Sequence, residues 1–276
     1  MGLRVLERPN HHRISCLTDQ NALAGVLDDV RPDFVFHLAG TSFATDPSEY
    51  YRINTEYATA LLAAFTLAGL TDLPLLLMGT SAEYGLVDDH ELPLREGHRP
   101  RPYNHYGISK LAQTLEGLAY HGRTKGAIVL VRPFNLIGPG MPSHLALQNF
   151  ALQIAGFRRT GSAPIIEAGR LDSMRDFVDV EDAVALLWDL VRTPQAYGQI
   201  VNVCSGKATS IGELLHGLIA ISGLPVLVQA AAEREKPIDI PIHFGDPQKL
   251  FSLVGWVPRA DVSGTLRQIL EETERL

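Results

Sequence analysis

Three short apolar runs, separated by longer stretches of helical pattern, constrain the fold of this chain most strongly. The runs lie at 33–38, 73–78 and 127–132, and the helical stretches between them lie at about 47–68 and 103–124. Short strands that alternate with helices are typical of a parallel sheet with crossover connections. The sequence therefore predicts an α/β fold with a Rossmann-like, doubly wound parallel sheet.

The alternation changes after Gly138-Pro-Gly140, which indicates a second, smaller α/β lobe. Beyond this point the pattern predicts helices at about 148–159, 180–192 and 209–222. We expect a Rossmann-like core, a smaller substrate lobe and a C-terminal helix. The core would span 1–135 plus 176–204, the lobe 136–175 plus 205–260, and the last helix 261–276.

The composition argues against several classes of protein. The formal charge of −7 gives no support for nucleic-acid binding, which favours a basic surface. No apolar run approaches the ~20 residues that span a bilayer, and the N-terminus has no signal-peptide apolar segment. Cys16 and Cys204 build no disulfide framework, which fits a reducing compartment. We therefore expect a cytoplasmic protein with no nucleic-acid or membrane partner.

Tyr106 and Lys110 lie four residues apart in a stretch that reads as a helix. Residues with this spacing share one helix face. A free tyrosine titrates near pH ~10, and a lysine held beside it favours the phenolate and lowers the pKa. Such a pair can donate or accept a proton near neutral pH. Taken alone, Tyr106 and Lys110 could also be ordinary surface residues on a solvent-exposed helix face.

Two hydroxyl side chains, Thr80 and Ser81, follow the second apolar run directly. In doubly wound sheets, ligands bind outside the carboxyl ends of the strands. The two residues are therefore candidates for a site that also contains Tyr106. Their alternative role is to satisfy backbone groups of a turn.

Several further short sequence motifs occur along the chain, before and after these residues. They lie at 37–40, 78–85, 132–140, 164–169, 175–182, 202–206, 245–249 and 255–258. In these blocks the chain resembles the extended short-chain dehydrogenase/reductases, or NAD-dependent epimerase/dehydratase family, that act on nucleotide sugars. The similarity runs from about Leu3 to the C-terminus and is to the branch of GDP-4-keto-6-deoxymannose reductases and GDP-mannose 4,6-dehydratases.

The resemblance implies a proton-relay site of four catalytic residues. Tyr106 would be the acid or base, and Lys110 would lower its pKa and bind the nicotinamide ribose. Thr80 would hydrogen-bond the sugar oxygen that gains or loses the proton. Asn54 matches an asparagine that supports the lysine through water.

The resemblance also implies a dinucleotide cofactor, NADP or NAD, and no metal. The residues that match cofactor-binding positions are Glu7, Arg8, Leu38, Ala39, Gly40, Tyr106, Lys110 and Pro133. Glu7 falls where an acid would bind the adenosine ribose, whereas Arg8 could favour a 2′-phosphate. The alternative for both residues is a charged strand end.

The chain departs from the family pattern at its beginning, where the strand and Gly-rich loop that bind the pyrophosphate are missing. Cys16 also stands where the family often has an aspartate that contacts adenine. Three explanations are open for the missing unit. The natural protein has a further N-terminal segment, residues 3–6 take the central slot of the sheet, or a partner supplies the strand.

Five residues match substrate-binding positions of the family. They are Ser81, Asn135, Arg175, Lys236 and Asp239. Arg175 would hold the diphosphate, since a guanidinium binds phosphate oxygens in pairs. Its alternative role is a surface ion pair with Asp172 or Asp176. Lys236 and Asp239 replace an Arg and a Glu of the relatives, so the nucleotide could differ from GDP.

The turn after the second run favours one reaction. Dehydratases of this branch place a glutamate two residues after the catalytic threonine, and this chain has Ala82 there, followed by Glu83. We therefore predict reduction of a GDP-4-keto-6-deoxyhexose at C4, with NAD(P)H as hydride donor. The alternatives are a dehydratase or epimerase of the same family, or a pseudoenzyme that binds nucleotide sugars without a dinucleotide.

A homodimer is the expected assembly. Family members often pair the two core helices that here carry Asn54 and Tyr106. The stretch from Tyr57 to Phe65 is apolar most of the way round, and such a helix is buried on more than one face. A partner helix or loops of the same chain could provide the second cover.

Overall fold

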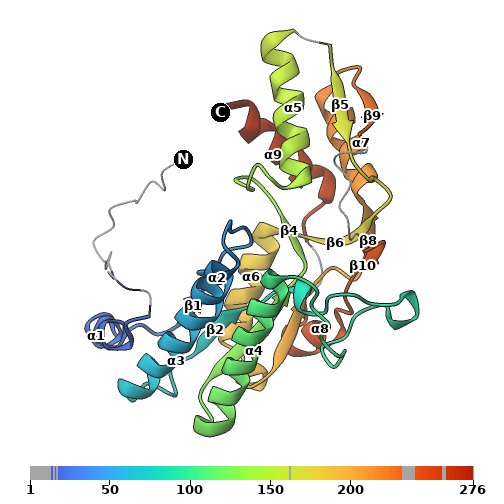
Figure 1. Cartoon of the computed structure of the whole chain (residues 1–276). Helices are drawn as coiled ribbons and strands as arrows, with labels where there is room; N and C mark the ends of the chain where they lie inside the picture. The colour runs from blue at the N-terminus through green and yellow to red at the C-terminus, as the bar shows by residue number, and fades with distance from the viewer. Residues whose placement is uncertain are drawn as a thin grey trace. The chain divides into compact units, whose positions relative to one another are not determined.

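The computed structural model describes residues 14, 16, 18–161, 163–231, 240–256 and 259–275 (Figure 1). The chain forms two compact units, each assembled from separate segments. The first comprises Met1–Glu83, Pro102–Val131 and Val191–Ile200, and the second comprises Tyr84–Arg101, Arg132–Leu190 and Val201–Leu276. Residues 84–101, 132–135, 176–190 and 201–204, expected in the core, thus cluster with the second unit, as does the C-terminal helix. The division into a cofactor core and a substrate lobe stays a prediction.

A parallel sheet begins in the first unit. Its strands are ordered β1-β2-β3-β7, with β1 at Val35–His37, β2 at Leu75–Met78, β3 at Ile128–Pro133 and β7 at Ile200–Val203. Leu75 pairs with Val35 on one side and with Ile128 on the other. Leu75, Leu76 and Leu77 are all buried, as expected for a parallel strand covered on both faces. The three apolar runs are therefore strands, and the predicted Rossmann-like α/β class is confirmed.

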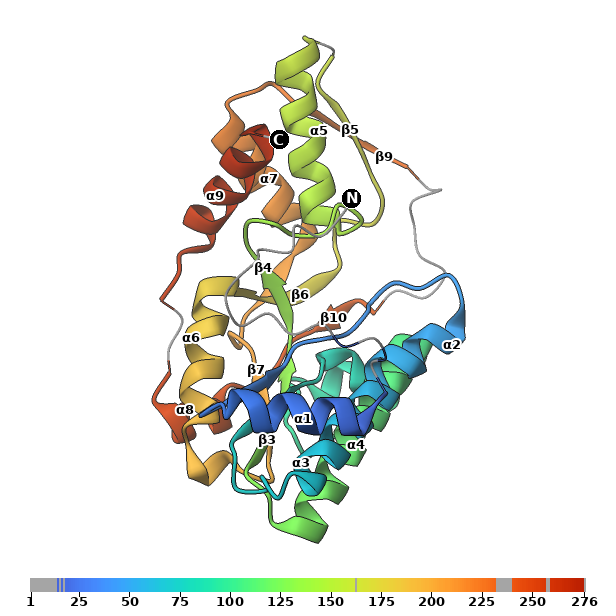
Figure 2. The same cartoon turned by 90° about the vertical axis from the view of Figure 1, so that its left-hand side faces the viewer.

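Helices α1, α3 and α4 pack next to one another in the first unit (Figure 2). They span Gln20–Val30, Tyr57–Leu67 and His105–Thr124. Leu23 and Leu27 of α1 share a core with Leu61 and Phe65 of α3. Both α3 residues are buried within a single chain, so the apolar pattern of α3 gives no argument for a partner helix.

Helix α4 lies close against the sheet at Gly117. A Cβ atom at this position would be 2.6 Å from Leu130 Cδ2 and 3.0 Å from Leu77 Cδ2. A larger residue would clash with the ends of the Leu130 and Leu77 side chains, which would have to move. Gly117 thus allows α4 to pack closely against β2 and β3.

The helix predicted at 47–68 is interrupted. It consists of α2 (Pro47–Tyr50), a π-helical turn η1 (Tyr51–Glu56) and α3. In the π-helical turn, Thr55 Oγ1 donates to the carbonyl of Ser109 on α4 at 2.8 Å, and Asn54 is buried. A π-helical turn admits an extra residue, which here allows side chains of η1 to bind α4.

The second unit contains two further sheets. One has the order β10-β6-β4 with β8 also paired to β6, and the other pairs β5 with β9. Their bounds are β4 Asn135–Ile137, β5 Ile165–Ala168, β6 Met174–Asp179, β8 Ala208–Ser210, β9 Leu227–Ala230 and β10 Ile242–His243. The helices are α5 Ala146–Thr160, α6 Val180–Val191, α7 Ile211–Ser222, α8 Gln248–Val254 and α9 Val262–Arg275, and a short 3-10 turn lies at Asp89–Glu91. Two further 3-10 turns, Ser81–Glu83 and Pro194–Ala196, lie in the first unit.

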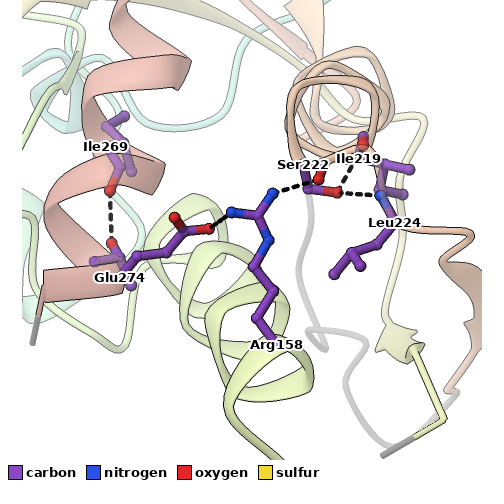
Figure 3. Close-up of polar contacts among 7 residues, drawn as sticks. Arg158, Ile219, Ser222, Leu224, Ile269 and Glu274 are labelled. Carbon is purple, nitrogen blue, oxygen red and sulfur yellow. Dashed lines mark hydrogen bonds and ion pairs between the residues drawn. The ribbon is translucent and has the colours of Figure 1, made fainter. Parts of the chain in front are cut away.

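Helices α5, α7 and α9 surround a common apolar core in the second unit. Arg158 of α5 links the other two helices at one end of this core, where it donates to Glu274 Oε1 at 2.5 Å and to the carbonyl of Ser222 (Figure 3). In the part of the chain that the structure describes, no helix combines the length and apolar character required to cross a bilayer.

Candidate active site

The turn after β2 places Thr80 at the carboxyl edge of the sheet. The amide of Gly79 donates to the carbonyl of Val131 on β3 at 2.7 Å, and residues Ser81–Glu83 form a single 3-10 turn, η2. Thr80 Oγ1 accepts a hydrogen bond from the amide of Ala82 at 3.2 Å. The Thr80 hydroxyl thus stabilises the turn and can still donate a hydrogen bond to another group.

Tyr106 lies in the first turn of α4, close enough for the Thr80 side chain to influence its pKa. Asn104 caps this helix, because its side chain accepts from the amide of Gly107 at 2.8 Å. Burial raises the pKa of Tyr106, the hydrogen bond from Thr80 opposes this, and the charge of Glu83 adds to it. The direction is opposite to the lowered pKa predicted from the Tyr106–Lys110 spacing.

Lys110 is buried one helical turn after Tyr106. Its ammonium donates to the carbonyl of Met78 and to Gln113 Oε1, the latter at 2.8 Å. Burial lowers the pKa of Lys110 to about 8, and the charge of Glu83 opposes this effect. These two bonds direct the ammonium toward the end of β2. The largest effect on the pKa of Tyr106 is therefore burial and not the charge of Lys110.

Asn54 joins the loop after β1 to helix α4. Asn54 Oδ1 accepts from the amide of Thr41 at 2.8 Å. Asn54 Nδ2 donates to the carbonyl of Thr41 and to Ser109 Oγ, both at 3.0 Å. All the polar atoms of the Asn54 side chain are therefore bound to Thr41 and Ser109. The predicted support of Lys110 through water stays untested.

The buried carboxylate of Glu83 was not among the predicted site residues. Glu83 Oε1 accepts from the amide of Thr80 and from Thr114 Oγ1, both at 3.0 Å, and the side chain is fully buried. The sequence signal for it is weak, since an acid three residues after a strand-end threonine reads equally well as a solvated turn. Only the fold shows that the η2 turn directs it inward.

The loop 38–40 follows β1 and is exposed next to this group. A Cβ atom at Gly40 would lie 3.1 Å from Asn54 Oδ1 and 3.7 Å from Lys110 Nζ. Of the predicted cofactor residues, Gly40 is thus brought near Lys110, and Leu38 and Ala39 precede it in the same exposed loop. Pro133 is buried in the part of β3 that belongs to the second unit. Glu7, Arg8 and residues 3–6 lie outside the described residues.

The predicted substrate residues are divided between the two units. Ser81 is buried in η2 of the first unit. Asn135 and Arg175 belong to the second unit, where Asn135 Nδ2 donates to the carbonyl of Asp176 at 3.0 Å and Arg175 Nη1 donates to that of Met174 at 2.8 Å. Lys236 and Asp239 lie outside the described residues.

The two acids considered as ion-pair partners of Arg175 bind other groups. Asp172 pairs with Arg170 at 2.7 Å. Asp176 is fully buried, accepting from Ser205 and from the amides of Gly206 and Gly245. These contacts give no support to the surface ion-pair alternative.

The chain is similar to known proteins over most of its length. Residues 4–204 match the model of the NAD dependent epimerase/dehydratase family. The chain is 34% identical over 249 residues to GDP-6-deoxy-D-mannose reductase of Pseudomonas aeruginosa, covering 88% of this chain and 81% of the relative. It is 30% identical over 258 residues to GDP-6-deoxy-D-talose 4-dehydrogenase of Aggregatibacter actinomycetemcomitans, covering 93% and 83%.

A solved structure has the same fold over nearly the whole chain. RMD from Pseudomonas aeruginosa, in complex with NADPH, superposes with a TM-score of 0.89 at 29% identity, covering 97% of this chain and 89% of that one. The family match extends over well more than half of the sequence and includes Thr80, Tyr106 and Lys110. The chain belongs to the NAD dependent epimerase/dehydratase family.

Proposed function

We propose that the protein is an NAD(P)-dependent oxidoreductase that reduces the 4-keto group of a GDP-4-keto-6-deoxyhexose. The observation that carries the proposal is that Tyr106 interacts with Thr80 at the turn after β2, with Lys110 buried one turn further along α4 and bonded to the carbonyl of Met78 at the end of that strand. The relatives named for GDP-6-deoxy-mannose and GDP-6-deoxy-talose support a deoxysugar attached to GDP.

The residues around Lys110 fit a nicotinamide ribose. An ammonium has three N–H donors, and among the described residues two are used, by Met78 and Gln113. The third is available for a ribose hydroxyl. Gly40 keeps this side of Lys110 open, because any side chain there would approach Asn54 and the ammonium. When bound, NAD(P)H would supply the hydride.

Tyr106 has the protonation state that reduction requires. Burial raises the pKa of its phenol, so the group carries its proton at neutral pH. Thr80 and Tyr106 would both hydrogen-bond the oxygen at C4 of the sugar, and Tyr106 would give its proton to the alkoxide as hydride arrives at the carbon. The protonated phenol also stabilises the negative charge that develops on this oxygen.

The η2 turn supports reduction rather than dehydration. Ala82 has no group that could remove a proton from the sugar. Glu83 is fully buried, and its Oε1 is engaged by Thr80 and Thr114. We propose roles in substrate binding for Ser81, Asn135, Arg175, Lys236 and Asp239, with Arg175 on the diphosphate.

The test is a reduction assay with a GDP-4-keto-6-deoxyhexose and either NADPH or NADH, followed by nicotinamide absorbance. We expect loss of absorbance with the wild-type protein and at least a ~10²-fold slower rate for Tyr106→Phe, which lacks the proton. Dehydration of a GDP-hexose without reduction would contradict the proposal. Calorimetric binding of GDP but of neither dinucleotide would favour a pseudoenzyme that binds nucleotide sugars.

We also propose a homodimer and a cytoplasmic location. Helix α4 exposes Ile108 and Leu115, which lie seven residues apart and so on the same helix face. Two copies of this face would bury each other in a symmetric pair. The location is supported by two free cysteines, Cys16 and Cys204, which fit a reducing compartment.

A further inference from the structure

We infer that Glu83 is a positioning residue of the proposed reductase site: its buried carboxylate fixes the backbone of Thr80 and supplies the negative charge that Lys110 faces. This inference rests on the proposed function for its catalytic consequence. The structural part concerns contacts of Glu83 within the first unit and can be tested without substrate.

The carboxylate of Glu83 lies in a buried position with two hydrogen-bond donors. Glu83 Oε1 accepts from the amide of Thr80 and from Thr114 Oγ1, both at 3.0 Å. A Cβ atom at Gly79 would lie only 2.5 Å from Glu83 Oε1 and 2.7 Å from the carbonyl of Val131. Glycine is therefore required before Thr80, because any side chain would displace the carboxylate or the strand.

The contact with the Thr80 amide determines where the Thr80 hydroxyl points. Glu83 closes a small ring with Thr80, since its side chain binds the backbone of the residue three positions earlier. The same backbone carries the hydroxyl that accepts from the amide of Ala82 and influences the pKa of Tyr106. Loss of the carboxylate would free one end of this turn and loosen the alignment of Thr80 with Tyr106.

The charge of Glu83 acts on both titrating groups of the site. Among the described residues, the titratable groups that face Glu83 or its partners are Tyr106 and Lys110 on α4 and His37 on β1. Glu83 raises the pKa of Tyr106 and that of Lys110, whereas His37 is neutral near pH 7, since burial and the charge of Lys110 lower its pKa to about 4.

Glu83 therefore favours the protonated form of both groups. Burial favours release of the proton of Lys110, and the nearby negative charge works against this release. A neutral lysine would lose its attraction for the ribose and for developing negative charge. With Glu83 neutralised, both Lys110 and Tyr106 should release their protons at lower pH.

The test is Glu83→Gln, which keeps the size and one acceptor oxygen but removes the charge. We expect the alkaline limb of the kcat profile for reduction to move about one pH unit lower. Glu83→Asp should retain a limb near the wild-type position. Glu274→Gln, the same chemical change on α9 of the second unit, should leave the limb unchanged.

A second measurement needs no substrate. The Lys110 resonance in protein labelled with ¹³C-lysine, identified by its absence in Lys110→Arg, should titrate at lower pH in Glu83→Gln than in wild type. An unchanged Lys110 titration and an unchanged alkaline limb would overturn the inference. If wild type reduces no tested sugar, the proposed function fails, and the Lys110 titration still decides the role of Glu83.

A second variant covers the case in which Glu83→Gln does not fold. Thr114→Val removes one of the two donors to the carboxylate and leaves its charge in place. We expect a severalfold lower kcat with KM little changed, and recovery in Thr114→Ser, which restores the hydroxyl. A kcat equal to that of the wild-type protein in Thr114→Val would show that the position of the Glu83 carboxylate does not affect the function of Thr80.

Discussion

Lys110 is a buried cation, and its protonation affects stability as well as catalysis. Its pKa is about 8 in the folded protein and 10.5 in an ordinary environment. Between these values the unfolded chain holds a proton that the folded protein has released. Unfolding free energy therefore rises with pH in this window, because stability increases wherever the unfolded state binds more protons.

Lys110→Met removes this titration. Relative to the variant, the wild-type protein should gain stability as pH rises from about 8 toward 10.5, by up to about 3 kcal/mol over the whole window. The loss of the Gln113 bond in the variant is independent of pH and does not alter the slope. Urea unfolding at several pH values between 7.5 and 10 measures the difference.

The control for this experiment is Lys207→Met, at an exposed lysine of the second unit. Its pH dependence should run parallel to that of the wild-type protein. Equal slopes for the wild-type protein and Lys110→Met would mean that the ammonium is not desolvated as the structure indicates.

Residues of the site differ in how far the sequence could predict them. The sequence predicted that Thr80, Tyr106 and Lys110 share a site, and the structure brings them together in the first unit. The bonds of Asn54 depend on the π-helical turn, which no periodicity of apolar residues reveals. The place of Glu83 depends on how tightly η2 turns after Gly79. Both are consequences of backbone geometry that a local sequence pattern does not specify.

At the scale of elements, Arg158 connects three helices. It donates to Glu274 on α9 and to the carbonyl of Ser222 at the end of α7, a position where carbonyls lack partners within their helix. Its side chain is partly exposed, so the ion pair alone contributes little. The bond from a charged donor to the Ser222 carbonyl is the larger contribution.

Arg158→Ala should lower the unfolding free energy by about 1 kcal/mol, since it removes that bond and leaves the carbonyl without its charged donor. Chemical denaturation followed by circular dichroism measures the change. Arg159→Ala is the matched control, because Arg159 is the exposed neighbour on the same helix. Equal losses in the two variants would mean that the link between α5, α7 and α9 adds no stability.

Most elements were predictable because their apolar patterns reflect burial. The apolar runs 33–38, 73–78 and 127–132 correspond to β1, β2 and β3, and the stretch at 148–159 corresponds to α5, which spans Ala146–Thr160. The short strands β8 and β10 have only three and two residues, too few to show an alternation. Their pairing with β6 is fixed by tertiary contacts instead.

At the scale of the whole molecule, the proposed dimer rests on the exposed face of α4. The wild-type protein should scatter light at about twice the 30.2 kDa chain mass at micromolar concentration. Leu115→Glu places a charge in the middle of the proposed contact, which should shift the mass to that of one chain. Val184→Glu, at another exposed apolar position, should leave the dimer intact.

A wild-type mass of one chain in this measurement would contradict the dimer. Helix α3 would not be affected by that result. Its residues Leu61 and Phe65 are buried by α1 and the sheet of the same chain.

The segmented composition of the two units has a consequence for biosynthesis. Strand β3 is complete at residue 133, yet its neighbour β7 begins only at residue 200. A ribosome adds roughly 5–20 residues per second, so one edge of a wholly buried strand waits on the order of several seconds for its partner. During this interval the nascent chain presents an apolar, unpaired β-edge, which is the kind of surface that chaperones protect. Strand β7, which ends at Val203, thus sets the earliest moment at which the ribosome-bound chain can finish this sheet.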